Sequence, residues 1–217
     1  MMRLLIPALL LSLLTACAPE PRLAIIETGD PILTYDFEAT TLPPLSLNGD
    51  QALFRPIESE LEAAVVADRG YIWYLTGATY TDTAVSVTVR QTEGQVDGQG
   101  FGLLCRADDM GNGYYFVIAA SGHAAVLKAT PDEPDPVPLQ RWGAFDAVRE
   151  GREAVNELTA ICAGDHLRFL VNNQIIADLR DPDFSEGQVG VVLGATAETL
   201  WLRFDDLALS EAVLGDD

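Results

Sequence analysis

Residues 157–179 contain three apolar runs separated by two very short turns. The runs read "ELTAICA", "HLRFLV" and "QIIADL". Only two residues separate each pair of runs, Gly164-Asp165 in the first turn and Asn172-Asn173 in the second. Gly and Asn are among the few residues that accept the positive φ angles of tight hairpin turns. The segment therefore predicts two successive hairpins, which constrains the chain to an antiparallel sheet.

Short strands and turns continue over most of the chain. Val85, Val87 and Val89 alternate with polar residues, as expected for a half-buried strand. The segments 101–106 and 114–119 flank "ADDMGNG", whose residues favour a tight turn, so they predict another hairpin. About ten short strands, few helices and no internal repeat predict a single all-β antiparallel β-sandwich.

Two features modify this pattern. The apolar alternation of the last strand changes phase at Asp205-Asp206, which predicts a β-bulge. Residues 139–156, which include Trp142, show the least regular pattern, and we expect a long loop with a helical turn there.

The first 17 residues are typical of an export signal rather than of the fold. Arg3 precedes an apolar run too short to span a bilayer, and the run ends in Leu14-Thr15-Ala16-Cys17. This ending resembles the bacterial lipobox, which implies cleavage before Cys17 and lipidation of its thiol. The alternative is an ordinary signal peptide with a chance cysteine. We expect a signal peptide at 1–16, a lipidated tether at 17–32, the sandwich at 33–210 and an acidic tail at 211–217.

Charge restricts the partners of such a protein. The 217 residues carry 13 Lys and Arg against 33 Asp and Glu, a formal net charge of −20. Such a surface repels nucleic acids and anionic lipid headgroups. We therefore expect no nucleic-acid partner, a monomer, and membrane contact only through the lipid anchor, in the bacterial cell envelope outside the cytoplasm.

The order of several motifs carries a family resemblance. A strand ending in Cys105-Arg106 leads into an Asp-rich turn and an aromatic return strand; "FLVNN", "DPDFSEGQVGV" and "FDDLAL" follow. Over residues 36–210 this order resembles the concanavalin A-like (laminin-G/glucanase-like) jelly roll of bacterial extracytoplasmic lipoproteins, although that family usually has Asn-Gly at the position of Asn172-Asn173. The resemblance implies a binding or structural module, for carbohydrate or an envelope protein, with some relatives that cleave glycosides.

The enzyme alternative depends on Glu58, Glu60 and Glu62. Their alternate spacing resembles the carboxylate triplet of the glucanase members, except that the central residue there is Asp. A solvated strand edge in an acidic protein explains the triplet equally. Asp108-Asp109 belongs to the predicted turn, where exposure opposes the raised pKa of an acid catalyst. We expect no catalytic residues, and glycoside cleavage through Glu58 and Glu62 remains the alternative.

Binding would use aromatic side chains, because flat rings suit the faces of sugars. Trp73 and Trp142 lie in irregular stretches, which favours positions at a rim, and we predict them as ligand-binding residues. The alternative is that they belong to the core, as buried aromatic residues commonly do.

No cofactor is expected to be required. Glu38 and Asp205 provide hard oxygen ligands near both ends of the predicted fold, and they are the candidates for a structural calcium site. The alternative is that Asp205-Asp206 is an acidic bulge that protects a strand edge.

Cysteine usage predicts one disulfide. With Cys17 lipidated, Cys105 and Cys162 remain, in a compartment where disulfides persist. Apolar residues alternate before each of them, so both side chains should point into the core. A bond forms if their strands are neighbours in one sheet. The alternative is two buried free thiols.

Overall fold

The computed structural model describes residues 23–35, 37 and 52–215. The expected leader, the lipidated Cys17 and the calcium candidate Glu38 lie outside these ranges. Within them, no helix is long and apolar enough to cross a membrane.

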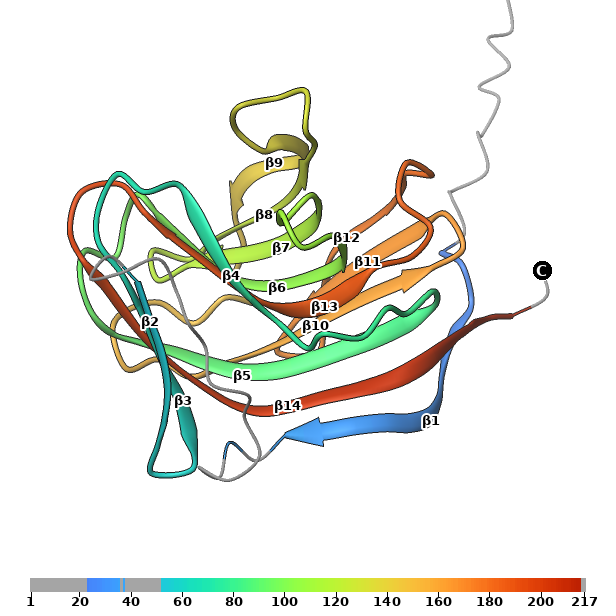
Figure 1. The fold of residues 1–217 in the computed structure, drawn as a ribbon, viewed down its shortest axis with the longest axis horizontal. Helices are drawn as coiled ribbons and strands as arrows, with labels where there is room; N and C mark the ends of the chain where they lie inside the picture. The colour runs from blue at the N-terminus through green and yellow to red at the C-terminus, as the bar shows by residue number, and fades with distance from the viewer. Residues whose placement is uncertain (1–22, 36, 38–51, 216–217) are drawn as a thin grey trace, which may run out of the picture.

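Two antiparallel sheets pack face to face (Figure 1). The eight-stranded sheet has the order β12 (Gln174–Arg180), β11 (His166–Val171), β10 (Asn156–Ala163), β5 (Thr83–Glu93), β14 (Leu200–Leu214), β3 (Glu60–Val65) and β2 (Ala52–Ile57), with β1 (Ile26–Tyr35) paired to the second half of β14. The six-stranded sheet has the order β4 (Tyr71–Leu75), β13 (Gln188–Ala195), β6 (Gln99–Ala107), β7 (Gly113–Ala119), β8 (His123–Ala129) and β9 (Val137–Ala144). This architecture confirms the predicted all-β sandwich.

The core fills the space between the sheets because every central strand turns one row of apolar side chains inward. Val85, Val87 and Val89 of β5 are buried there, as their alternation predicts. Phe116 of β7 and Phe169 of β11 meet edge to face across the core, with ring centroids 5.7 Å apart. The inner rows of both sheets therefore belong to one continuous core, and the outer faces remain for other roles.

The predicted turns and the bulge are confirmed. Asn172 and Asn173 have φ angles of 48° and 64°, and they connect β11 to β12. The pairing of β14 with β5 shifts register between Asp205 and Ala208, and Asp206 has a φ of 52°. The shift lets Leu207 and Leu209 return to the core after Phe204.

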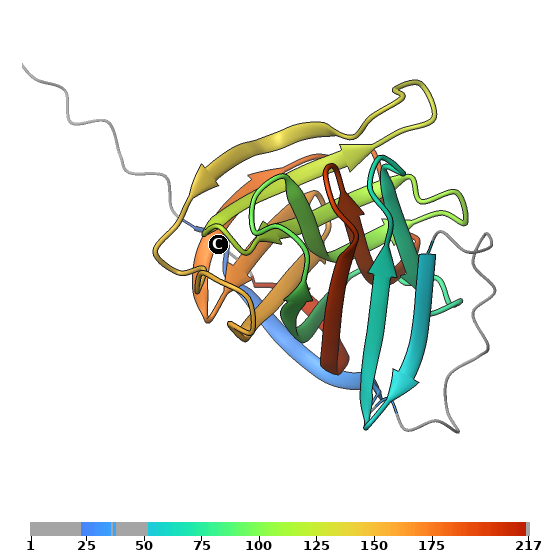
Figure 2. The ribbon, with the colours of Figure 1, turned by 90° about the vertical axis from the view of Figure 1, so that its left-hand side faces the viewer.

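The structure corrects three expectations about the chain ends and edges. Strand β1 begins at Ile26, inside the expected tether, and Ile26 pairs with Leu214, inside the expected tail. The paired fold therefore covers 26–214 rather than 33–210. Strand β9 forms where a loop with a helical turn was expected, and it is an edge strand, where Pro138 is tolerated. Strands β9 and β1 lie on opposite sides of the molecule (Figures 1 and 2).

Candidate functional site

The main cleft lies on the outer face of the six-stranded sheet and has a volume of about 970 Å³. Strand β4 forms one edge of this sheet and β9 forms the other. Both predicted ligand-binding residues line the cleft, Trp73 from β4 and Trp142 from β9. Two residues 69 positions apart in the sequence therefore share one hollow.

Small residues form the floor of the cleft. Gly194 of β13 pairs with Gly100 of β6 on one side and with Tyr71 of β4 on the other, and Ala119 of β7 also lines the cleft. A Cβ atom at Gly194 would lie 2.9 Å from the ring of Tyr71. The absence of side chains at these positions creates the hollow and lets the Tyr71 ring lie close to the sheet.

Two aromatic side chains converge above Gly100. A Cβ atom there would lie 2.6 Å from the hydroxyl of Tyr71 and 3.3 Å from the indole ring of Trp142. Trp142 is 42% exposed, whereas Tyr71 packs edge to face on Tyr115 with ring centroids 5.4 Å apart. Burial raises the pKa of Tyr71 to about 12, so this hydroxyl stays protonated at neutral pH and is available as a hydrogen-bond donor.

Trp73 rests on the turn between β6 and β7. A Cβ atom at Gly111, whose φ is +81°, would lie 2.7 Å from three ring atoms of Trp73. Asp108 fixes this turn, because its Oδ1 accepts hydrogen bonds from the backbone N–H groups of Met110 (2.8 Å) and Asn112 (2.9 Å). The tyrosine hydroxyl of Tyr115 donates to the carbonyl of Gly111 at 2.7 Å. The turn predicted around Asp108-Asp109 is confirmed, and it supports the Trp73 side of the cleft.

Loops supply the ionisable groups of the cleft. Asp68 and Arg69 precede β4, Asp97 precedes β6, and Glu133 and Asp135 lie between β8 and β9. Among the floor strands, His123 at the start of β8 also lines the cleft, and its Nδ1 lies 3.1 Å from the carbonyl of Ser121.

The sequence analysis did not identify the floor glycines or the loop carboxylates. A signal for the floor was present in the sequence: Gly100 and Gly102 lie in one strand, and Gly190 and Gly194 in another. Glycine inside a strand often marks a position where another group approaches the backbone closely.

The glutamate triplet lies in the other sheet. Glu58 and Ser59 form the turn between β2 and β3, with φ angles of 52° and 64°. Glu60 and Glu62 project from the face of β3 opposite the core residue Leu61, with side chains 16% and 9% exposed. The core and the six-stranded sheet therefore separate them from the cleft.

Arginines neutralise Glu60 and Glu62. The Nη2 of Arg90 donates to Glu60 at 2.7 Å, and the Nη2 of Arg203 lies 3.0 Å from Glu62. Strand β3 pairs with β2 on one side and β14 on the other. The expectation of a solvated strand edge is therefore wrong for these two residues, which belong to a partly buried ion-pair network on a paired strand.

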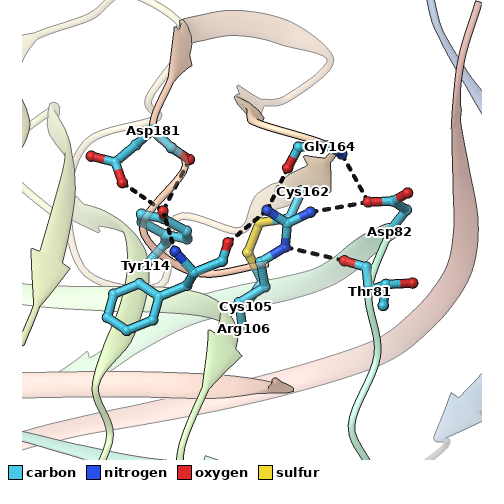
Figure 3. The surroundings of a disulfide bond; sticks show 9 residues. Thr81, Asp82, Cys105, Arg106, Tyr114, Cys162, Gly164 and Asp181 are labelled. Atoms are coloured by element: carbon cyan, nitrogen blue, oxygen red, sulfur yellow. Dashed lines mark hydrogen bonds and ion pairs between the residues drawn. A yellow bond between two sulfur atoms is a disulfide. The ribbon is translucent and has the colours of Figure 1, made fainter. Parts of the chain in front are cut away.

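The predicted disulfide between Cys105 and Cys162 is confirmed (Figure 3). Both residues are fully buried, and their Cα atoms lie 6.8 Å apart. However, Cys105 belongs to β6 and Cys162 to β10, so the bond joins the two sheets through the core instead of neighbouring strands of one sheet. A disulfide of this kind indicates a location outside the reducing cytoplasm.

Arg106 extends the disulfide into a polar cluster (Figure 3). Its guanidinium donates to the carbonyls of Thr81 (3.1 Å), Gly164 (2.7 Å) and Phe184 (2.8 Å) and to the carboxylate of Asp82 (3.0 Å). Burial lowers the pKa of Arg106, and Asp82 opposes this effect. An arginine remains charged even so. Three loops are thus attached to the end of β6 that lies away from the cleft floor.

Tyr114 forms the neighbouring part of this cluster. Its hydroxyl donates to Asp181 Oδ1 at 2.6 Å and accepts a hydrogen bond from the backbone N–H of Phe184 at 3.1 Å. Lys128 donates to the other oxygen of Asp181 at 2.7 Å. The connection between β12 and β13 is therefore fixed to β7 and β8.

The calcium site stays a prediction. Asp205 is half-buried beside the bulge, and its Oδ1 accepts the backbone N–H of Asp206 at 2.8 Å. Burial raises its pKa, and the negative charges of Asp206 and Glu60 add to this effect. Within the described ranges, no three His, Cys, Asp or Glu residues are grouped to hold a metal ion.

Comparison with known proteins gives fold relatives only. No family model and no curated protein matches the chain. A Bacillus subtilis protein of unknown function with a galectin-like fold is 13% identical, with a TM-score of 0.65 over 88% of this chain and 100% of its own. The carbohydrate binding module CBM66 from Bacillus subtilis is 16% identical, with a TM-score of 0.61 over 74% and 92%.

An enzyme shares the same architecture. The GlcNAcα1-4Gal-releasing endo-β-galactosidase from Clostridium perfringens is 9% identical, with a TM-score of 0.52 over 88% of this chain and 65% of its own. Identities this low are evidence of shared fold alone. The chain is a jelly-roll-like, two-sheet sandwich that resembles galectin-like and concanavalin A-like carbohydrate-binding modules and glycoside hydrolase domains.

Proposed function

We propose that this protein is a cell-envelope lipoprotein whose domain binds carbohydrate without cleaving it, in the cleft on the six-stranded sheet. One observation carries the proposal: Trp73 and Trp142 reach one cleft from opposite edges of the sheet, above a floor of Gly and Ala. An open floor leaves room for a flat ligand, and indole rings offer the apolar faces against which such a ligand packs.

The distribution of carboxylates supports binding without cleavage. Glycoside hydrolysis uses a pair of carboxyl groups that flank the scissile bond. The outward positions of the floor strands carry small and apolar residues, such as Gly100, Ala119 and Val192, and the acids of the cleft lie in loops. The enzyme alternative through Glu58 and Glu62 is disfavoured, because these residues lie on the opposite sheet and Glu62 is paired with Arg203.

The lipid anchor is the second part of the proposal. The lipobox-like Leu14-Thr15-Ala16-Cys17 follows an apolar leader, and the buried disulfide fits the oxidising compartment to which such a leader directs a chain. A diacylglycerol on Cys17 would supply two acyl chains, which suffice for stable anchoring. Replacing Cys17 with Ser should release the protein from the membrane fraction, and a variant that remains there would contradict the anchor.

A glycan array followed by affinity electrophoresis tests the binding function. We expect the mature protein to bind at least one glycan, and Trp142→Ala or Trp73→Ala to weaken that binding roughly 30-fold, as for an aromatic residue worth about 2 kcal/mol. Ile175→Ala is the matched control, because Ile175 is an exposed apolar residue on β12 of the other sheet. Binding that survives both tryptophan substitutions would exclude the cleft as the site.

The same preparations test the absence of catalysis. Incubation with the bound glycan should leave its chain length unchanged. Turnover that disappears in Glu62→Gln would instead establish the enzyme alternative. If no glycan binds and the cleft variants lose an envelope protein partner, the domain is a protein-interaction module.

A further inference from the structure

The ionisable side chains that line the cleft are mostly acidic. Four carboxylates line it, Asp68, Asp97, Glu133 and Asp135, against one guanidinium, Arg69. The four carboxylates and the one guanidinium together carry a formal charge of −3.

These four carboxylates are not neutralised. In the part of the chain that the structure describes, none of their side chains accepts a hydrogen bond or forms an ion pair. By contrast, Lys128 of β8 contacts both Asp181 (2.7 Å) and Asp183 (2.6 Å). These two carboxylates therefore already compensate the positive charge of Lys128. The cleft therefore carries a net negative potential, and the protein's overall charge of −20 adds to it.

The carboxylates line the cleft from three separate loops. Asp68 and Asp97 lie in the loops before β4 and β6, near the ends of those strands that carry Tyr71 and Gly100. Glu133 and Asp135 lie in the loop before β9, the strand of Trp142. A ligand that occupies the length of the cleft is thus approached by acids from three loops.

We infer that the ligand class of this cleft is an uncharged glycan, and that the loop carboxylates exclude uronic acids, sulfated sugars and other anionic glycans. The inference rests on the proposed function and adds the chemical class. Carboxylates can accept hydrogen bonds from the hydroxyl groups of a neutral sugar. Toward a sugar carboxylate or sulfate they offer no donor and a repulsive charge.

The test uses pairs of polymers that differ only in charge. Neutral glucans, galactans, mannans and fructans are compared with sulfated derivatives of the same polymers, by affinity electrophoresis of the mature protein at low ionic strength. We expect a neutral polymer to bind, and we expect the affinity of its sulfated form to be lower by at least about tenfold. Added salt should narrow the difference by screening.

Variants assign the discrimination to the cleft. Asp97→Asn/Asp135→Asn should raise binding of the sulfated polymer and lower the ratio of the neutral to the sulfated affinity. Glu157→Gln, an exposed acid on β10 of the other sheet, is the matched control and should change neither.

The outcomes separate this inference from the proposed function. Stronger binding of a sulfated or an amino-bearing polymer, abolished by Trp142→Ala, would overturn the uncharged class while the carbohydrate-binding function stands. Discrimination that Asp97→Asn/Asp135→Asn leaves unchanged would overturn the role of the loop acids. Binding of no polymer at all would overturn both the function and the class.

Discussion

Strand β6 has two dissimilar halves. Its first half contributes Gly100 and Gly102 to the outer face, where the cleft floor lies, and Trp142 and Tyr71 cover Gly100. Its second half contributes Cys105 to the inter-sheet disulfide and Arg106 to the buried polar cluster. Five positions separate Gly100, at the open floor of the cleft, from Cys105, in the inter-sheet disulfide.

The two halves of β6 show how one strand can contribute to both stability and ligand recognition. Bonds at the Cys105 end fix β6 relative to the opposite sheet and to three loops, so breaking them should lower the free energy of unfolding. The glycines at the other end contribute shape rather than bonds. Substitutions should therefore lower stability most at the Cys105 end, and a substitution at Gly100 should affect mainly ligand binding.

The largest effect is expected from removing the disulfide. Cys105→Ala/Cys162→Ala opens a cross-link between residues 57 positions apart, which on the chain-entropy model lowers the free energy of unfolding by about 4 kcal/mol. Urea unfolding of the oxidised parent and the double variant measures the difference. An unchanged midpoint would mean that the two halves of β6 do not differ as described.

Removing the guanidinium of Arg106 should cost about 3 kcal/mol, because Arg106→Met deprives the carbonyls of Thr81, Gly164 and Phe184 and the carboxylate of Asp82 of a buried donor. Arg180→Met is the control. Arg180 is exposed and pairs with Asp165 at 3.2 Å on the surface, so its loss should cost less than about 1 kcal/mol. Equal losses in the two variants would argue against a special role for the Arg106 cluster.

Two glycine substitutions sharpen the comparison within the first half of the strand. At Gly102 a Cβ atom would lie 2.0 Å from the backbone carbonyl oxygen of Phe116, so Gly102→Ala must displace β7 and should destabilise the fold by about 2 kcal/mol. At Gly100 it would meet only the ends of Tyr71 and Trp142, which can shift.

Gly100→Ala should therefore weaken glycan binding roughly tenfold and change stability by less than about 1 kcal/mol. Thermal melts and affinity electrophoresis on both variants provide the readout. If Gly100→Ala unfolds the protein while glycan binding by the folded fraction persists, the floor has a structural role only.

The smallest effect concerns pH and the Asp181 contacts. Burial alone would raise the pKa of Asp181, but hydrogen bonds from Lys128 and Tyr114 outweigh it and lower the pKa. A carboxylate with a lowered pKa in the folded state stabilises the fold above its unfolded pKa of about 3.9, and this stability is lost as the pH falls through the folded pKa. In Asp181→Asn, the free energy of unfolding should therefore fall less steeply than in the parent as the pH is lowered below about 4.

Unfolding curves between pH 2 and 7 measure this slope, with Asp132→Asn, an exposed loop substitution, as the control. A slope that is identical in Asp181→Asn and the parent would show that these contacts contribute nothing.

Local patterns in the sequence predicted the features that depend on neighbouring residues. The Asn172-Asn173 hairpin, the bulge at Asp205-Asp206 and the inward row of Val85, Val87 and Val89 all follow from short-range chemistry. Most of strand β1 was missed because residues 17–32 were interpreted as a tether. Gly29, Asp30 and Pro31 instead form an irregular stretch of an edge strand, with register shifts on either side of Pro31.

Features that depend on pairing between strands remote in sequence could not be predicted from the sequence. Cys105 and Cys162 were matched by counting, but nothing local indicates that their strands belong to different sheets. Trp73 and Trp142 were chosen from their irregular surroundings, yet only the order of six strands places them on one cleft. The ion pairs of Glu60 and Glu62 likewise require β14 and β5, which are remote in sequence.

The position of β14 has a consequence for the order of assembly. This last strand lies inside the eight-stranded sheet and pairs with β5, β3 and β1, so the sheet lacks its centre until residue 214 is available. A chain threaded through a translocation pore from its N-terminus cannot close this sheet while the end is still behind the membrane. Under the proposed export, the sheet could therefore close only after residue 214 had crossed, and Cys105 and Cys162 could be joined there.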